Sequence, residues 1–97
     1  MADGLTLVVS LFVHPGRQAE FEEFETKASA IMRRHGGTMR RIALAPGADP
    51  AQPHEIHIVT FPDQQSYESY RADAELTSLA NLRSRAIRQT IVWRGLK

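Results

Sequence analysis

Four stretches of the chain show the alternation of apolar and other residues that half-buried β-strands produce. They cover residues 5–13, 38–45, 55–61 and 87–94. The first, LTLVVSLFV, places Leu5, Leu7, Val9, Leu11 and Val13 on one face. The other face holds Thr6, Val8, Ser10, Phe12 and, one step on, His14. One wholly apolar side and one mixed side are typical of a central strand with helices on one face.

Residues 17–35 have apolar positions three and four apart, as one face of an α-helix requires: Phe21, Phe24, Ala28, Ile31 and Met32. Glutamates occupy the early turns, and Arg33, Arg34 and His35 close the last, as the helix dipole favours. Gly36-Gly37 supplies a left-handed exit. These features predict a long amphipathic helix.

A second helical region follows the strand at residues 55–61. Pro62 lacks the N–H that a continuing ladder needs, and Asp63 can cap a helix that starts at residue 64 or 65. Tyr67 and Tyr70 are spaced for one helical face. We expect a break near Asp73, which can cap further turns carrying Leu76, Leu79 and Leu82. Residues 46–53, PGADPAQP, predict a loop.

The predicted order is strand, helix, strand, strand, helix, strand. Two βαβ-type halves of this kind form a four-stranded antiparallel sheet with both helices on one face. The expected fold is therefore a ferredoxin-like α+β sandwich, in one domain over residues 1–97.

Two helices cover only one face of such a sheet. If Ile56 and Ile58 face the helices, the uncovered face carries Val8, Phe12, His57, Val59 and Phe61. An apolar face of that size predicts association. We expect a homodimer packed sheet to sheet.

Composition excludes several classes of function. Twelve basic and eleven acidic residues leave a net charge of +1, so no basic excess indicates nucleic-acid binding. Without cysteine, disulfides and thiolate chemistry are excluded, and a reducing cytoplasm is the expected location. The apolar run near the N-terminus is too short to span a membrane and has no basic region before it, which argues against a signal peptide.

The element order, the VHPGRQAEFEEFE stretch and the run IVTFPDQQSYESYR, followed by ADAEL, resemble the dimeric α/β-barrel superfamily. Small domains of unknown function and antibiotic-biosynthesis-monooxygenase-like domains are the most similar members. The resemblance implies that two protomers pair their sheets into a barrel whose interior holds a small-molecule pocket. Members include cofactor-free oxygenases, haem-degrading enzymes, isomerases and proteins with no known reaction.

His57 and His14 are the candidate catalytic residues, because imidazole titrates near neutrality. Candidate ligand-binding residues are Phe12, Phe61, Tyr70, Arg71 and Trp93. A tyrosine hydroxyl, of Tyr67 or Tyr70, with a guanidinium nearby suits an anionic or phenolic substrate. Structural roles compete with each of these: a solvated strand end for His14, a surface hydrogen bond for His57, core packing for the tyrosines and a dimer contact for Trp93. Whether Arg40 or Arg41 faces the barrel depends on the register.

No metal or cofactor is expected. His54 and His57, three apart on a strand, face opposite sides, and no Walker, GxGxxG or GxSxG motif occurs. The resemblance associates oxygenase activity with an asparagine, a tryptophan and a histidine or arginine. The one asparagine, Asn81, falls in the helical region and no tryptophan lies near Tyr67, so that set does not map. Two hypotheses remain: a protein that binds a small hydrophobic or aromatic metabolite, and a cofactor-free monooxygenase- or isomerase-like enzyme with a pocket histidine.

Overall fold

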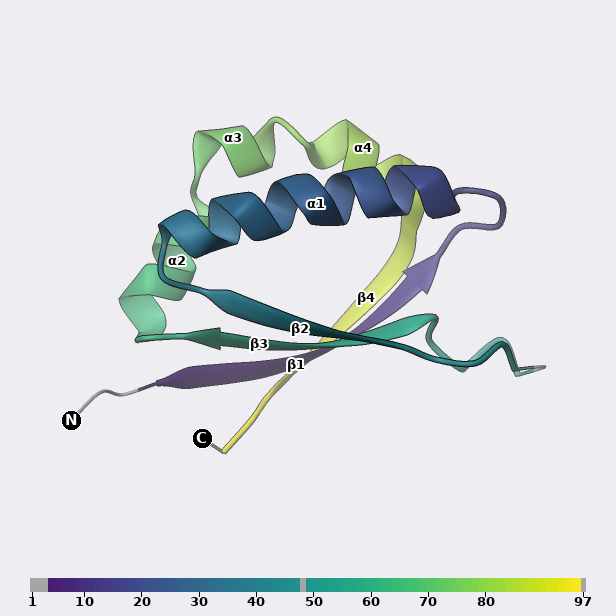
Figure 1. Ribbon diagram of the computed structural model, residues 1–97, viewed down its shortest axis with the longest axis horizontal. Helices are drawn as coiled ribbons and strands as arrows, with labels where there is room; N and C mark the ends of the chain where they lie inside the picture. The colour runs from purple at the N-terminus through teal and green to yellow at the C-terminus, as the bar shows by residue number, and fades with distance from the viewer. Residues whose placement is uncertain (1–3, 48, 97) are drawn as a thin grey trace.

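The computed structural model describes residues 4–47 and 49–96. Its elements follow the predicted order, with the second helical region divided into three short helices (Figure 1). They are β1 (Leu5–Val13), α1 (Gln18–Arg34), β2 (Thr38–Ala43), β3 (Glu55–Phe61), α2 (Gln64–Arg71), α3 (Ala74–Thr77), α4 (Ala80–Ala86) and β4 (Ile87–Arg94).

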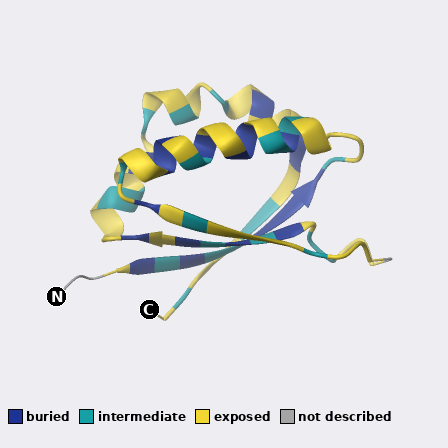
Figure 2. Cartoon of the chain, viewed as in Figure 1, coloured by how far each residue is buried: buried dark blue, intermediate teal, exposed yellow. Residues whose placement is uncertain are grey.

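The four strands form one antiparallel sheet in the order β2-β3-β1-β4. The helices lie on one face of it, with α1 crossing the sheet beside α3 and α4 (Figure 1). The expected ferredoxin-like arrangement is therefore confirmed. In Figure 2 the buried residues of α1 lie on the side toward the sheet, and its exposed residues face away.

Sequence-local chemistry explains where the helices begin and end. The Asp63 carboxylate accepts the Ser66 backbone N–H at 2.7 Å and starts α2, and Asp73 accepts the Glu75 and Leu76 amides at the start of α3. Gly36, with φ of 80°, ends α1 in the left-handed region that glycine adopts without strain. Both predicted caps and the predicted glycine exit are confirmed.

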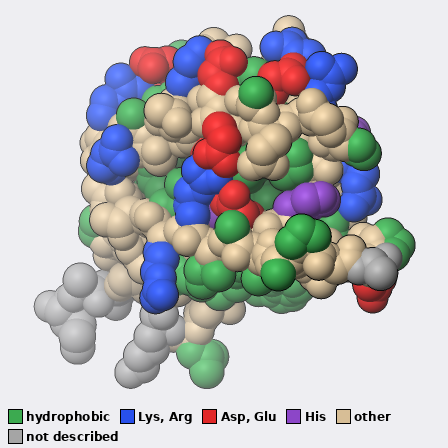
Figure 3. All heavy atoms as spheres, turned by 45° about the vertical axis from the view of Figure 1, so that its right-hand side comes forward, with side chains coloured by type: hydrophobic (Ala, Val, Ile, Leu, Met, Phe, Trp, Pro, Cys, Tyr) green, Lys and Arg blue, Asp and Glu red, His purple; other side chains and the backbone are tan. Residues whose placement is uncertain are grey.

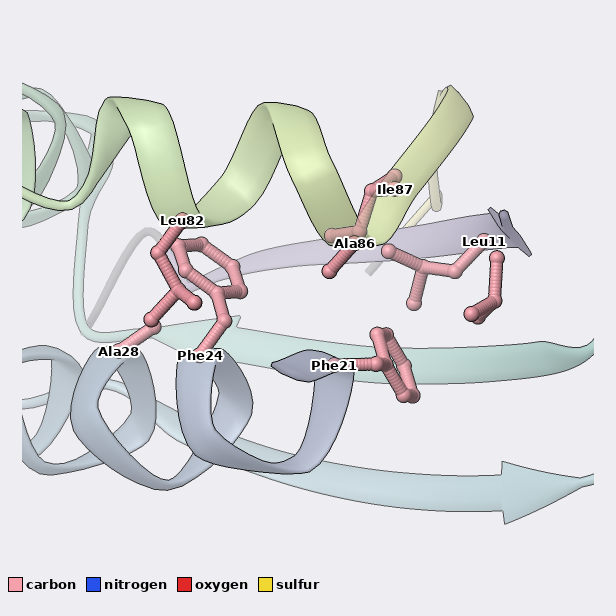
Figure 4. Close-up of a cluster of buried hydrophobic side chains, with 8 residues drawn as sticks. Leu11, Phe21, Phe24, Ala28, Leu82, Ala86 and Ile87 are labelled. Carbon is pink, nitrogen blue, oxygen red and sulfur yellow. The ribbon is translucent and has the colours of Figure 1, made fainter. Parts of the chain in front are cut away.

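The core between helices and sheet is built from two adjoining clusters. One joins β1 to α1 and α4, and Figure 4 shows the Phe24 ring of α1 lying beside Leu82 of α4. The other joins β1 and β3 to the second half of α1 and to α2, and includes Leu7, Ile31, Met32, Val59 and Phe61.

The prediction for the two faces of β3 is wrong. His57, Val59 and Phe61 face the helices, because their partners on β1 are Val9, Leu7 and Leu5, which belong to the helix-covered core. Ile56 and Ile58 instead pair with Ser10 and Val8 on the uncovered face. When a strand has apolar residues on both faces, alternation does not show which face the helices cover. The assumption that the β-branched Ile56 and Ile58 face the helices was therefore wrong.

The uncovered face is nevertheless apolar. Cross-strand pairing places the following residues on it: Val8, Phe12, Ile42, Ile56, Ile58, Ile91 and Trp93. Trp93 is 52% exposed and Ile42 36%. In Figure 3 hydrophobic side chains gather along the lower part of the molecule, on the side of the uncovered face, while charged side chains dominate over the helices.

Ile31, 1% exposed, tests the packing of α1 on the sheet. Ile31→Val removes one buried methylene, so we expect the free energy of unfolding in urea to fall by about 1 kcal/mol. Thr26→Ser removes a methyl group from an exposed position of the same helix and should change it by less than ~0.5 kcal/mol. Equal effects of the two substitutions would show that this face of α1 is not packed as described.

Candidate functional site

A cavity of about 480 Å³ lies between the sheet and the helices. Its walls come from β1, β3, α1 and the α2–α4 segment, with Val92 of the edge strand β4, half exposed, at one side. Most of the lining is apolar, including Leu7, Phe24, Ala28 and Val59. The volume falls within the range of small-molecule pockets.

Glu25 is the charged residue most deeply set in this cavity. It belongs to α1, is 5% exposed, and lines the cavity between Phe24 and Ala28. Burial raises the pKa of its carboxyl to about 7, against a smaller opposing effect of the Arg41 charge. A carboxyl with that pKa exchanges protons readily at neutral pH.

His57 stands beside Glu25 on the floor of the cavity. Its Nδ1 lies 3.8 Å from Oε1 of Glu25, and its Nε2 lies 2.8 Å from Oε1 of Glu55. Burial lowers the pKa of His57, although the hydrogen bond to Glu55 opposes that shift. The imidazole is therefore neutral at pH 7. An ionised Glu55 carboxylate can only accept a hydrogen bond, so Nε2 of His57 carries the proton. Nδ1 is then unprotonated, and its lone pair faces Glu25.

Arg41 keeps Glu55 ionised. Its Nε and Nη2 donate to the two Glu55 oxygens, each at 2.8 Å, and its Nη1 and Nη2 donate to Glu22 at the same distance. Burial alone would raise the pKa of Glu55, but the hydrogen bonds from Arg41 and His57 outweigh it and the pKa is lowered. The hydrogen bond from Arg41 likewise lowers the pKa of Glu22.

The α2–α4 segment adds aromatic hydroxyls and two arginines to the lining. Tyr67, Tyr70 and Arg71 of α2 and Arg83 of α4 line the cavity. Burial, together with the nearby Glu25 charge, raises the pKa of Tyr70 to about 12, so its hydroxyl stays protonated. The cavity therefore combines an acid–base group with a neutral phenol and cationic side chains.

The structure brings some of the proposed site residues together and separates others. His57, Phe61, Tyr70 and Arg71 line the cavity. Phe12 lies on the uncovered face, with the Arg88 guanidinium 5.1 Å from its ring centroid, and Trp93 lies on the same face. His14 follows β1, where its N–H donates to the Ala86 carbonyl, outside the cavity.

The sequence did not predict Glu25 and Glu55 as site residues, and it left open whether Arg40 or Arg41 faces the site; the register pairs Arg41 with His57. Glu25 was counted among the acidic residues of the early helix turns, although it lies four residues from Phe21 and three from Ala28, within the apolar stripe. A carboxylate on an apolar helix face is the signal that identifies it. Arg41 gave no such signal, because its ion pairs join residues far apart in the sequence.

His54 lies in the loop before β3, where its Nδ1 accepts the Val13 backbone N–H at 3.1 Å, outside the cavity that His57 lines. Over residues 4–47 and 49–96 no group of three or more His, Asp or Glu side chains is arranged to hold a metal ion. Across the same residues no helix has the length and apolar character needed to cross a bilayer.

The fold and the cavity define the chain as a ferredoxin-like α+β protein with an acid–base group between sheet and helices. The sequence matches no protein-family model and no curated protein. Solved structures do resemble it. A mutant form of SnoaB, a cofactor-independent oxygenase from Streptomyces nogalater, is 22% identical, with a TM-score of 0.72 over 99% of this chain and 94% of that one.

Two further structures show the same architecture. A DABB family protein with a ferredoxin-like fold from Mesorhizobium loti is 15% identical, with a TM-score of 0.72 over 97% of this chain and 96% of that one. A protein from Bacteroides thetaiotaomicron, named as a candidate antibiotic biosynthesis monooxygenase, is 12% identical, with a TM-score of 0.75 over 97% and 89%. These likenesses confirm the ferredoxin-like fold.

The raised pKa of Glu25 predicts a pH-dependent penalty on stability. The folded protein holds this proton up to about pH 7, whereas the unfolded chain releases it near 4.5. Stability is therefore lost as pH rises between these values. Glu25→Gln removes the penalty, so its free energy of unfolding relative to the parent should rise by about 3 kcal/mol from pH 4 to pH 8.

Urea denaturation at several pH values measures this difference, and carbon-13 NMR of the glutamate carboxyls gives the pKa directly. Glu22, whose pKa is lowered, serves as the internal reference. A pH-independent difference between Glu25→Gln and the parent, with Glu25 titrating at 4.5, would contradict the burial of this carboxyl.

Proposed function

We propose that the protein binds a small, largely apolar cyclic or aromatic metabolite between its sheet and helices and transfers a proton on it without a cofactor. The observation that supports this most strongly is the row Glu25, His57 and Glu55: Glu25 and His57 line a largely apolar cavity, and Glu55 holds the far side of the His57 ring. Polar groups in such a position cost stability, and they cluster at functional sites more often than elsewhere in a core.

Glu25 is the group that would remove the proton. As a carboxylate in apolar surroundings it is poorly solvated, and it becomes a stronger base than a surface glutamate. The natural substrate is a molecule with an acidic C–H next to a carbonyl, or a phenol. Loss of the proton leaves an enolate or phenolate, which the Tyr70 hydroxyl on the cavity wall can stabilise by donating a hydrogen bond.

His57 is a second proton acceptor next to Glu25. Its Nδ1 lone pair faces Glu25, so a small movement closes the 3.8 Å gap to hydrogen-bond distance. Once protonated, the imidazolium lies against Glu55, whose charge Arg41 holds in place. Return of the proton to a different carbon of the substrate completes an isomerisation.

Cofactor-free oxygenation is a second candidate, favoured by the structural likeness to SnoaB, itself a cofactor-independent oxygenase. It shares the first step. The carbanion that Glu25 creates would pass its electron pair to molecular oxygen and, after protonation, form a hydroperoxide. Loss of water from a hydroperoxide on a C–H carbon leaves a carbonyl group. Dioxygen is then the oxidant and no metal or flavin takes part.

A homodimer formed through the uncovered sheet face belongs to the same proposal. Val8, Ile56, Ile58, Ile91 and Trp93 make this face apolar on three neighbouring strands. A second copy of the chain offers a surface of matching chemistry, and two such faces pack as the layers of a sandwich do. The site between sheet and helices remains accessible in that arrangement. A cytoplasmic location, suggested by the cysteine-free composition, is also part of the proposal.

Hydrogen–deuterium exchange tests the proton transfer. A panel of cyclic and aromatic ketones, including 2-tetralone and 1-indanone, is incubated with the protein in D₂O, and loss of the α-proton signal is followed by NMR. We expect catalysed exchange that Glu25→Gln lowers by about 100-fold or more, because the base is removed while the shape is kept. Oxygen consumption by the same samples distinguishes oxygenation from isomerisation.

Glu23→Gln is the matched control, since Glu23 is an exposed residue of the same helix paired with Lys27. It should exchange protons at the parental rate. Protein-dependent exchange on none of the ketones, or equal rates for Glu25→Gln and Glu23→Gln, would refute the proposed acid–base role.

The dimer is tested by a charge in the middle of the uncovered face. Ile58→Arg should convert a species of twice the chain mass into a monomer in light scattering, because the guanidinium would be desolvated in the interface. Ala30→Arg places the same side chain at an exposed position of α1 and should leave the dimer intact. A parent protein that is itself monomeric, or an Ile58→Arg variant that stays dimeric, would exclude this interface.

A further inference from the structure

The cavity contains two positive charges that the proton transfer does not use. Arg71 of α2 and Arg83 of α4 both line it, and both are exposed, so they lie at its mouth. The carboxyl of Glu25 lies deeper, among apolar side chains. The cavity is thus apolar within and cationic at its opening.

Hydroxyl groups, not carboxylates, hold these two arginines. Arg71 Nη1 donates to the Tyr67 hydroxyl at 2.9 Å, and its guanidinium lies 5.8 Å from the centre of that ring. Arg83 Nη2 donates to Thr90 Oγ1 at 2.7 Å. Within residues 4–47 and 49–96 neither forms an ion pair. Other arginines do: Arg17, Arg34, Arg41 and Arg85 each contact at least one carboxylate.

The two guanidinium groups act on the same part of the cavity. Each lowers the pKa of Tyr70 electrostatically, against the larger effect of burial, so both lie within range of its hydroxyl. Arg83 also acts on Glu25. Burial keeps Glu25 partly protonated at neutral pH, so its negative charge is reduced. The electrostatic potential at the cavity opening is therefore positive, because of the two arginines.

These charges select for an anion. A guanidinium has five N–H donors, and each arginine spends one on its hydroxyl partner, so most of its donors remain available to a carboxylate. A carboxylate at the mouth keeps part of its hydration, while an attached ring fills the apolar interior beside Glu25. An uncharged ligand would leave both cations without an anionic partner.

We propose that the substrate is an aromatic or cyclic carboxylic acid, bound with its carboxylate between Arg71 and Arg83 and its ring in the apolar cavity. This inference rests on the proposed function, because it names the substrate class for the same site. The arginines are specificity-determining residues, and Glu25 acts on the part of the substrate farthest from the carboxylate.

A matched pair of ligands tests the inference without requiring turnover. Binding of 2-naphthoate and of its neutral isostere 2-naphthamide is measured by calorimetry at pH 7.5 in low salt. We expect the acid to bind about tenfold more tightly than the amide. The double variant Arg71→Gln and Arg83→Gln should bind both equally. Arg33→Gln, an exposed arginine of α1 outside the cavity, should retain the preference.

Each outcome separates the substrate class from the proposed function. Equal binding of acid and amide by the parent, or a preference that survives in the double variant, would overturn the carboxylate site while leaving the cavity as a binding site. Binding of neither ligand would overturn the cavity as a ligand site, and the proposed function with it. Glu25→Gln should keep the preference for the acid although it loses proton exchange, because the arginines bind the carboxylate and Glu25 transfers the proton.

Discussion

Arg41 makes the ion pairs on which the site depends. It donates to Glu22 on α1 and to Glu55 on β3 from its own place on β2, so one guanidinium ties the edge strand, its neighbour and the long helix together. The same contact keeps Glu55 ionised, which fixes the proton of His57 on Nε2. The orientation of the imidazole toward Glu25 therefore follows from an ion pair one step farther from the cavity.

The alternation of side chains along β3 determines which face of the sheet carries the candidate site. Because side chains alternate between faces, His57, Val59 and Phe61 must share a face, and Ile56 and Ile58 the other. In the observed register the first set closes the floor of the cavity and the second supplies the uncovered face. A one-residue shift would exchange these roles and place His57 on the uncovered face. The candidate site thus lies between the sheet and the helices of a single chain, and not on the uncovered sheet face where the sequence had placed it.

The sequence predicted the fold well because its evidence was local. Strand alternation, the Asp63 and Asp73 caps and Gly36 each depend on neighbouring residues, and the observed element bounds agree closely with the expected ones. The site was predicted in part. His57, Phe61, Tyr70 and Arg71 do line the cavity, but Trp93 and Phe12 lie on the other face. That difference depends on register and on pairing between distant strands, which a single sequence does not specify.

Glu25 lowers the stability of the fold, because its carboxyl is desolvated in the core. An apolar residue at this position of α1 would continue the stripe of Phe21, Ala28 and Met32 and add burial without the cost of desolvating a carboxyl. The chain carries a glutamate there instead, places His57 next to it, and supports that histidine with two further ionised groups. No cap, turn or element boundary requires this row of polar side chains. Proton transfer on a bound molecule would use such a row, and this asymmetry is the strongest physical argument for the proposed acid–base role of Glu25.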